Sequence, residues 1–161
     1  MTVDAKPATG ALALPLVYIN LDEDESRRLG IEVAFGAAGI VPERFAAVRW
    51  SRLSGTEQAS LYSAPLNARS YFRPLVAGEK GCYASHIGCW QRLLDSTASA
   101  LVVLEDDVLP QPGFAELVAA VAALPSGWDM VKLIGREREP PANAGRCTAD
   151  SSSSATGACP A

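Results

Sequence analysis

Three consecutive acidic residues, Glu105, Asp106 and Asp107, directly follow the apolar run at residues 101–104. Such a run is typical of a buried strand, and an unpaired charge buried at its end is costly. Two interpretations are open. The strand could run into a solvated turn, or the carboxylates could hold a divalent cation at its carboxyl end, since Mg²⁺ and Mn²⁺ prefer oxygen ligands. Residues 101–109 by themselves do not decide between them.

A second group with metal-ligand chemistry is formed by Cys82, His86 and Cys89. Their i, i+4, i+7 spacing would align them on one face of a helix, as zinc ligands can be. The same face carries Trp90 and Leu93, and small thiols are common in such apolar stripes. The apolar pattern therefore favours buried thiols over a zinc site.

The segments around these residues alternate between strand and helix patterns. Residues 15–21 are rich in β-branched and aromatic side chains, which predicts a buried strand. Residues 22–39 carry acids at the start, apolar residues at helical spacing and glycine at the end, which predicts a capped helix. The same criteria predict strands at 44–48, 99–107 and 129–135 and helices at 78–96 and 110–128.

The segment between residues 50 and 74 lacks a clear period and contains glycine, asparagine and proline. It predicts a loop with some short helix, of the kind that often contacts substrate. After it, Gly78 and Gly81 are expected to serve a tight helix entry.

Strand–helix–strand units build parallel sheets, so the predicted fold is α/β. Ligands bind such sheets outside the carboxyl ends of the strands, where Glu105, Asp106 and Asp107 are expected to lie. A phospho-acceptor receiver domain also has acids there, but it needs two helices before its next aspartate-bearing strand end. Here one predicted helix follows Asp107, and Asp129 lies at the beginning of the next predicted strand. The order of elements excludes the receiver interpretation.

The composition of the chain limits the kinds of molecule that it is expected to bind. The chain has 161 residues, 48% of them hydrophobic, and a net charge of −4 without any block of Lys and Arg, which argues against nucleic-acid binding. Asp4 lies where a secretory signal would be positive, and no apolar run reaches the roughly 20 residues that span a bilayer. We expect a cytoplasmic protein. Peripheral association with the cytoplasmic face of the inner membrane is compatible with this expectation. Residues 1–14 are expected to form a flexible arm, and residues 136–161 a disordered low-complexity tail.

Five segments together resemble glycosyltransferase family 25: PLVYINLDEDESRR, ERFAAV, GEKGCYASHIGCW, ALVVLEDDV and LPSGWDMVKL, in this order. The family includes lipopolysaccharide and lipooligosaccharide galactosyltransferases and collagen galactosyltransferases. The resemblance covers residues 15–135. It implies a GT-A-like, Rossmann-like sheet that binds a nucleotide sugar, and inverting transfer of a hexose, typically galactose, from a UDP-sugar to a lipopolysaccharide or polysaccharide acceptor. It also implies Mn²⁺ or Mg²⁺ at the donor diphosphate.

The resemblance assigns expected roles to the first strand and the helices. Asn20 and Asp22 would lie at the nucleotide. Arg27 and Arg28 would either reach the diphosphate or be solvated on the helix. The donor pocket would be lined by Glu79, Ser85 and His86, although a structural hydrogen bond is an equal alternative for His86.

The resemblance also assigns roles to the acids of the later strands. Asp107 is expected to be the direct metal ligand, with Glu105 binding the cation through water or touching the sugar. Asp106 would accept hydrogen bonds from the ribose hydroxyls. In the Trp128–Asp129 pair, Trp128 is expected to pack, and Asp129 is the spare carboxylate for a general base, although its place at the start of a strand argues against it.

Three departures from the family pattern matter. Glu23 stands where the family commonly has a basic residue, and Arg49–Trp50 replaces an Asp-Gly pair. The polar residues 136–161 stand where family members continue with acceptor-binding elements, so we expect a chain that is truncated at its C-terminus and transfers sugar poorly. The alternatives to an active enzyme are a non-catalytic remnant that binds nucleotide sugar and a general α/β binding module with solvated acids.

Overall fold

The computed structural model describes residues 12–133, which belong to two separate units. The first unit extends to Ser126, and the second begins at Gly127. None of the helices in residues 12–133 has the length and hydropathy needed to cross a bilayer.

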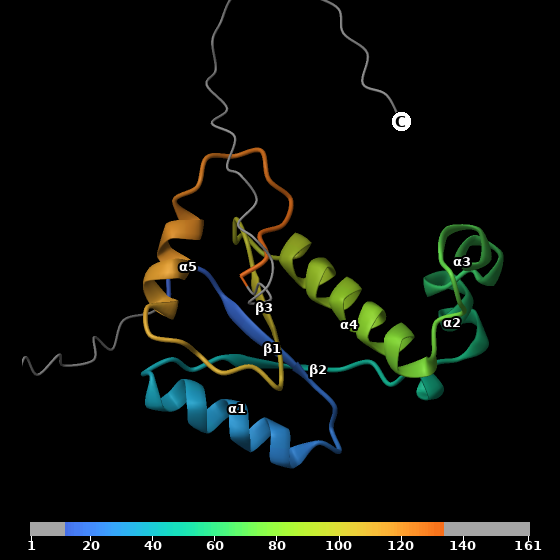
Figure 1. Cartoon of the computed structure of the whole chain (residues 1–161), viewed down its shortest axis with the longest axis horizontal. Coiled ribbons are helices and arrows are strands. Elements are labelled where there is room, and N and C mark those ends of the chain that lie inside the picture. The colour runs from blue at the N-terminus through green and yellow to red at the C-terminus, as the bar shows by residue number, and fades with distance from the viewer. Residues whose placement is uncertain (1–11, 134–161) are drawn as a thin grey trace, which may run out of the picture. The chain divides into compact units, whose positions relative to one another are not determined.

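The first unit contains a parallel sheet of three strands, β1 (Leu16–Asn20), β2 (Glu43–Ala46) and β3 (Val102–Glu105). Their order is β2-β1-β3, with β1 in the centre (Figure 1). The register pairs Asn20 with Ala46 and Ile19 with Glu105, so the carboxyl ends of all three strands meet at one edge. The three strands predicted within residues 15–107 are therefore confirmed, and the acids after β3 lie at the edge where ligands bind in such sheets.

Helices cover both faces of the sheet, which explains why β1 is buried along its whole length. Val17 and Ile19 pack with Cys89 on one face, whereas the Tyr18 hydroxyl on the other face donates a hydrogen bond to Glu32 at 2.5 Å. Successive side chains of a strand point to opposite faces, so a strand between two helical layers must be apolar at nearly every position.

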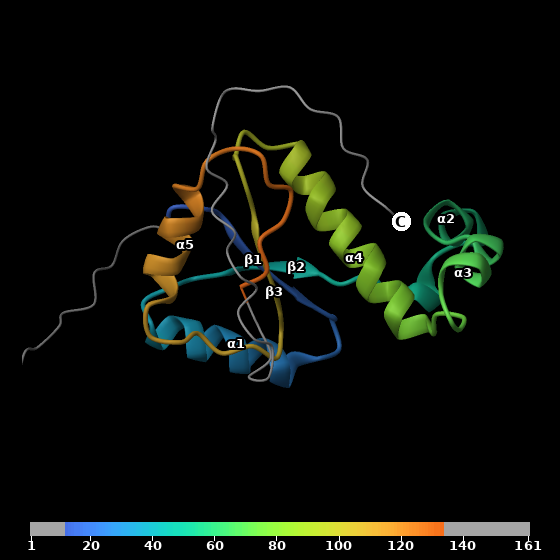
Figure 2. The same ribbon diagram turned by 45° about the horizontal axis from the view of Figure 1, so that its top comes forward.

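The covering helices are α1 (Glu25–Ala37), α4 (Ala77–Leu94) and α5 (Phe114–Ala122). Figure 2 shows α1 and α4 on opposite sides of the sheet, with α5 beside α1. The rings of Phe35 and Phe114 meet edge to face with centroids 5.4 Å apart, which joins α1 to α5. Helices α1 and α5 lie within the predicted ranges, and α4 begins one residue before its predicted range of 78–96.

The segment predicted as loop with short helix is more regular than expected. It contains a 3₁₀ turn, η1 (Trp50–Arg52), and two short helices, α2 (Gly55–Leu61) and α3 (Ala64–Ser70). Ser54 caps α2 in a capping box with Glu57, and Ser63 caps α3. The Ser-x-x-Glu spacing that marks the first of these caps is visible in the sequence.

One predicted strand falls in the second unit and is not found there. The strand expected at 129–135 is wrong for residues 129–133, which contain neither strand nor helix, and residues 134 and 135 lie outside the described part. Apolar content alone does not make a strand, because the backbone must also find hydrogen-bonding partners.

The predicted terminal segments fall mostly outside the described residues. Residues 1–11 of the expected arm and the whole expected tail at 136–161 lie there. Leu14 is described and is only 6% exposed, so the end of the expected arm belongs to the core.

Helix α4 passes very close to the chain that leaves β2. A Cβ atom at Gly81 would lie 2.6 Å from the backbone oxygen of Val48, whereas one at Gly78 would meet nothing within 4 Å. Ser85 strengthens the same contact, because its Oγ accepts a hydrogen bond from the Val48 N–H at 2.8 Å and donates one to the Gly81 carbonyl at 2.7 Å. Gly81 therefore permits close packing near the start of α4, whereas Gly78 meets no such constraint.

We expect Gly81→Ala to lower the free energy of unfolding by about 1–3 kcal/mol, because a backbone oxygen cannot yield to the added methyl group. Gly78→Ala is the matched control on the same helix, and it should leave stability unchanged or raise it by up to about 1 kcal/mol through helix propensity. Urea unfolding of both variants measures the difference. Equal stabilities would show that the close contact does not constrain residue 81.

Candidate functional site

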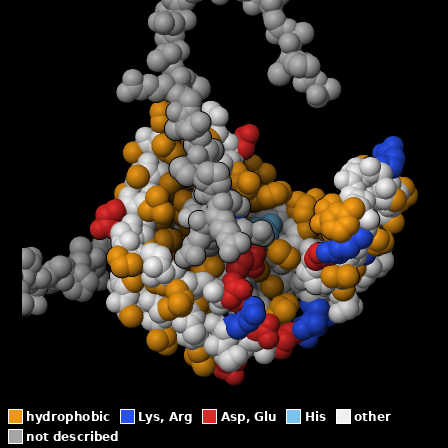
Figure 3. Space-filling model, viewed as in Figure 1, with side chains coloured by type: hydrophobic (Ala, Val, Ile, Leu, Met, Phe, Trp, Pro, Cys, Tyr) orange, Lys and Arg blue, Asp and Glu red, His pale blue; other side chains and the backbone are white. Residues whose placement is uncertain are grey.

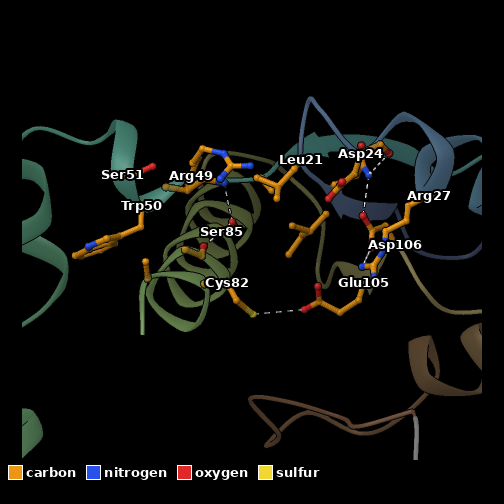
Figure 4. A pocket seen from close by; sticks show the side chains of 17 residues that line it. Leu21, Asp24, Arg27, Arg49, Trp50, Ser51, Cys82, Ser85, Glu105 and Asp106 are labelled. Carbon is orange, nitrogen blue, oxygen red and sulfur yellow. Dashed lines mark hydrogen bonds and ion pairs between the residues drawn. The ribbon is translucent and has the colours of Figure 1, made fainter. Parts of the chain in front are cut away.

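A cavity of about 220 Å³ opens at the carboxyl ends of the three strands. Its walls come from residues 19–21 at the end of β1, from the N-cap Asp24 and from Arg27 of α1, from residues 47–51 after β2, from Ala77, Gly78, Gly81, Cys82 and Ser85 of α4, and from Glu105 and Asp106 at the end of β3. Figure 4 shows the charged side chains of this wall pointing toward one another from α1 and β3. The sheet edge predicted to bind ligand thus carries a hollow with both charge signs.

The buried amide of Asn20 organises the bottom of the cavity. Asn20 is 1% exposed, and its Nδ2 donates to Asp106 Oδ2 at 2.7 Å and to the Asp24 carbonyl at 3.1 Å. Its Oδ1 accepts a hydrogen bond from Arg44 Nε at 3.1 Å. A buried amide needs such partners, and here they come from α1, β2 and the turn after β3. Asn20 therefore positions other groups of the site.

Asp106 is held between two donors. Its second oxygen, Oδ1, lies 2.9 Å from Nη1 of Arg27, and the Asp106 side chain is only 9% exposed. The hydrogen bond to Asp106 raises the pKa of the Arg27 guanidinium further above its already high value. The carboxylate is thus neutralised locally, while more than half of the Arg27 side chain remains open to solvent and to an anion.

Glu105 has a different environment. Its Oε1 lies 2.8 Å from His86 Nε2 and accepts a hydrogen bond from the Cys82 thiol at 3.7 Å. Burial, and then the neighbouring Glu105 charge, raises the pKa of Cys82 above its ordinary value. Within residues 12–133, Cys82, His86 and Glu105 are the group of three potential metal ligands whose donor atoms all lie within 4.8 Å of one another.

Cys89 is not part of this group. It is fully buried between α4 and the sheet, and burial raises its pKa to about 11. The expectation of a buried thiol is confirmed for Cys89 but not for Cys82, which is exposed at the cavity.

Within the first unit, five of the predicted site residues do not line the cavity: Asp22, Arg28, Glu79, His86 and Asp107. Asp22 forms an exposed ion pair with Arg44 at 2.6 Å, and the hydrogen bond from this guanidinium lowers the pKa of Asp22. Arg28 pairs with Glu25 on the surface of α1. Their predicted roles at the ligand stay predictions.

The remaining predicted residues have clear positions. Asn20, Arg27, Ser85, Glu105 and Asp106 line the cavity, and His86 touches it through Glu105. Asp107 is exposed beyond the end of β3, and Asp129, also exposed, lies in the second unit.

Residues 14–138 match the family model of glycosyltransferase family 25, described as LPS biosynthesis protein. This chain belongs to glycosyltransferase family 25. It is 33% identical over 138 residues to a glycosyltransferase 25 family member of Anopheles gambiae, across 79% of the chain and 22% of that relative.

Two vertebrate relatives of the family have more specific names. The chain is 33% identical over 81 residues to procollagen galactosyltransferase 1 of Danio rerio, which covers 48% of the chain and 13% of that protein. It is 31% identical over 94 residues to the probable inactive glycosyltransferase 25 family member 3 of Bos taurus, which covers 56% of the chain and 15% of that protein. The chain spans about a fifth of the length of the first curated relatives that it matches. No solved structure matches it.

Two departures from the family 25 pattern meet at the rim of the cavity. Glu23, which stands where a basic residue is common, forms an ion pair with Arg49, which stands where the pattern has aspartate. This ion pair holds the Arg49 guanidinium beside the acidic turn that precedes α1. Figure 3 shows acidic side chains (red) and basic side chains (blue) next to one another in the lower part of this face.

Sequence reasoning missed three residues of this family 25 site. Arg44 lies within β2, Arg49 follows this strand, and Cys82 was assigned to the core. A charged residue inside the short strand β2 was the available signal for Arg44, because an arginine among apolar strand residues needs an acceptor nearby.

We expect Asn20→Ala to lower the free energy of unfolding by about 1–3 kcal/mol, because it leaves buried partners of the amide unsatisfied. Asp22→Ala removes another partner of the same Arg44 but from an exposed position, so its effect should be clearly smaller. Chemical denaturation of both variants tests this order. A larger loss for Asp22→Ala would contradict the organising role of Asn20.

Glu79 is predicted to stabilise α4 rather than to bind the donor. Arg73 contacts both of its oxygens, at 2.7 and 2.5 Å, and the Val76 N–H donates to it at 2.9 Å. The bond from Arg73, followed by that from Val76, lowers the pKa of Glu79 from 4.5 to about 2.

A lowered pKa in the folded state stabilises the fold fully above the unfolded value of 4.5, and this contribution is lost as the pH falls toward about 2. The stability gap between the parent protein and Glu79→Gln should therefore be constant above about pH 5.5 and shrink below pH 4.5. Denaturant titrations across this range measure the gap. A gap that does not change with pH would refute the role of the Glu79 carboxylate.

Proposed function

We propose that this chain forms the donor side of a glycosyltransferase that takes a hexose, in first place galactose, from a UDP-sugar. The observation that carries the proposal is the cavity at the carboxyl edge of the sheet, where Arg27, Glu105 and Asp106 converge in a member of family 25. The name of the zebrafish relative supports galactose as the sugar.

The residues of the cavity offer complementary contacts to a nucleoside diphosphate. The exposed part of the Arg27 guanidinium can donate to a phosphate oxygen while it keeps its bond to Asp106. Each carboxylate oxygen can accept two hydrogen bonds, so Asp106 can still accept from ribose hydroxyls. Arg49, which is paired with Glu23, lines the cavity across from Arg27 and can offer a second guanidinium to an anion (Figure 4).

A divalent cation, Mn²⁺ or Mg²⁺, fits this donor set through Glu105. Such ions are commonly held by one or two carboxylates together with substrate phosphates, and Oε2 of Glu105 forms no hydrogen bond within the described residues. Asp107 is the second candidate ligand. When bound, the cation would stabilise the charge of the departing diphosphate. Asp106 is less suited, because both of its oxygens are already engaged.

The proposed transfer also requires a catalytic base and an acceptor for the sugar. An inverting transfer needs a base that takes the proton of the acceptor hydroxyl, and Asp129 is our candidate. Lipopolysaccharide or polysaccharide is the acceptor that we propose first, at the cytoplasmic face of the inner membrane. The names of the relatives make procollagen the alternative acceptor class.

A second candidate function is binding of a nucleotide sugar without transfer. It is favoured by the similarity to the bovine relative named probable inactive. Both functions require the donor cavity, so binding of the donor and transfer of the sugar must be measured separately. Release of UDP and labelling of an acceptor by radiolabelled UDP-galactose distinguish the two.

We expect UDP together with Mn²⁺ to stabilise the protein by about 2.7 kcal/mol at a ligand concentration 100 times its Kd, because the ligand binds only the folded state. Glu105→Gln and Asp107→Asn should each weaken this stabilisation. Glu116→Gln on α5 makes the same change in charge away from the cavity and is the matched control. Thermal unfolding and calorimetric titration measure the effect.

The preference for one nucleotide sugar over another tests the proposed donor. UDP-galactose should bind more tightly than GDP-mannose in the same titration. Equal affinities would overturn the assignment of a UDP-sugar. Unchanged UDP and Mn²⁺ binding in both carboxylate variants would remove Glu105 and Asp107 from the site.

A further inference from the structure

We propose that Cys82, His86 and Glu105 form a binding site for Zn²⁺ whose fourth coordination position opens into the cavity. This site differs from the one proposed for Mn²⁺ or Mg²⁺ in its ligand chemistry. Zinc binding to the three side chains does not depend on the proposed function.

The fold brings the three ligands together from two elements. Cys82 and His86 are four residues apart on α4 and therefore share one face of the helix. Glu105 ends β3, and the packing of α4 on the sheet places its Oε1 2.8 Å from His86 Nε2 and 3.7 Å from Cys82 Sγ. All three donor atoms lie within 4.8 Å of one another.

Two of the three donor separations are close to those of a tetrahedral zinc site, and the third, between Cys82 and His86, is at most 4.8 Å. Bonds of about 2.0–2.3 Å at tetrahedral angles put donor atoms about 3.3–3.7 Å apart. The distance between Cys82 and Glu105 already lies at this value, and the hydrogen-bonded distance between His86 and Glu105 needs to open by only about 0.5 Å. A small rotation of side chains that are partly exposed can supply this change.

The charge balance also favours a cation. Within residues 12–133, Glu105 forms no ion pair with Lys or Arg. The basic side chain beside it is that of His86. Its neighbour Asp106, by contrast, is paired with Arg27. A bound cation would supply the missing positive charge at Glu105.

The Cys82 thiol determines which cation the site prefers. Thiolate and imidazole ligands select Zn²⁺ over Mg²⁺ or Mn²⁺, which prefer oxygen ligands. Binding breaks the S–H bond of Cys82, forms an S–Zn bond and releases one proton to the buffer, while neutral His86 binds through the lone pair of Nε2. Because Cys82 and Glu105 line the cavity, the remaining zinc position faces it and can hold water or a ligand oxygen.

A consequence for regulation rests on the proposed function. Zn²⁺ and the cation of the nucleotide sugar would share Glu105, so the two metals should compete. Zinc would then inhibit donor binding without occupying the nucleotide position.

The test uses the full chain with Cys147→Ser and Cys159→Ser as the parent, so that these two thiols cannot contribute. Zn²⁺ alone is titrated by calorimetry in two buffers of different ionisation enthalpy, which reports the released proton. Co²⁺ is then added as a spectroscopic substitute, because a thiolate ligand gives a charge-transfer band. We expect one ion per chain, one released proton, and a band that excess Mg²⁺ does not remove.

Variants assign the ligands. Cys82→Ser should abolish the charge-transfer band and weaken Zn²⁺ binding by about 100-fold or more, since even loss of an outer-shell partner costs 10–100-fold. Cys89→Ala is the matched control, because Cys89 lies in the core on the same helix, and it should retain both properties. His86→Gln provides a second test at a partly exposed position, with circular dichroism to verify folding of each variant.

Unchanged Zn²⁺ affinity in Cys82→Ser and His86→Gln, or a band that is lost in Cys89→Ala but kept in Cys82→Ser, would overturn the proposal. The titration contains no nucleotide, so its outcome is separate from that of UDP binding. Zinc binding without UDP binding would leave this site in place and refute the donor function, and the reverse result would refute this site alone.

Discussion

The need to satisfy one buried amide, that of Asn20, holds the functional edge of this protein together. Asn20 ends the central strand, where water cannot reach it, and its hydrogen bonds extend to the beginning of α1, to Arg44 of β2 and to Asp106 after β3. Arg44 also donates to the Asn20 carbonyl at 3.0 Å. The three strand ends are thus fixed to a common partner, and the groups around the cavity inherit their positions from it.

This arrangement gives the adjacent acids Glu105 and Asp106 different environments. Asp106 is turned toward Asn20 and Arg27 and is neutralised, whereas Glu105 is turned toward α4 and meets a thiol and an imidazole. Side chains of successive residues leave an extended chain in opposite directions, so neighbouring carboxylates at a strand end enter different environments. One carboxylate therefore serves the positioning of Arg27, and the other is available to a cation.

The position of α4 makes the second environment possible. Its close approach to Val48 requires a residue without a side chain at Gly81 and a hydroxyl at Ser85. The same packing places Cys82 and His86 over the end of β3, within reach of Glu105. The helix thus contributes to the core through Cys89 and to the cavity through Cys82, less than two helical turns apart.

The sequence by itself determined the β1, β2 and β3 strands, the three long helices and the acidic edge, because hydrophobic period and the rule for parallel sheets act locally or through simple topology. Membership of family 25 was also visible in five short segments. The sequence could not determine which acid faces the cavity, since a single turn after β3 decides between Glu105 and Asp107. It also suggested Cys89 as a partner for Cys82 and His86, because helical spacing reports one element alone. The true neighbour of these two side chains, Glu105, is 19 residues from His86 along the chain, and only the packing of α4 against the sheet brings it there. Residues 129–133 do not form the expected strand, because an apolar pattern reports burial and does not by itself supply the hydrogen-bonding partners that a strand needs.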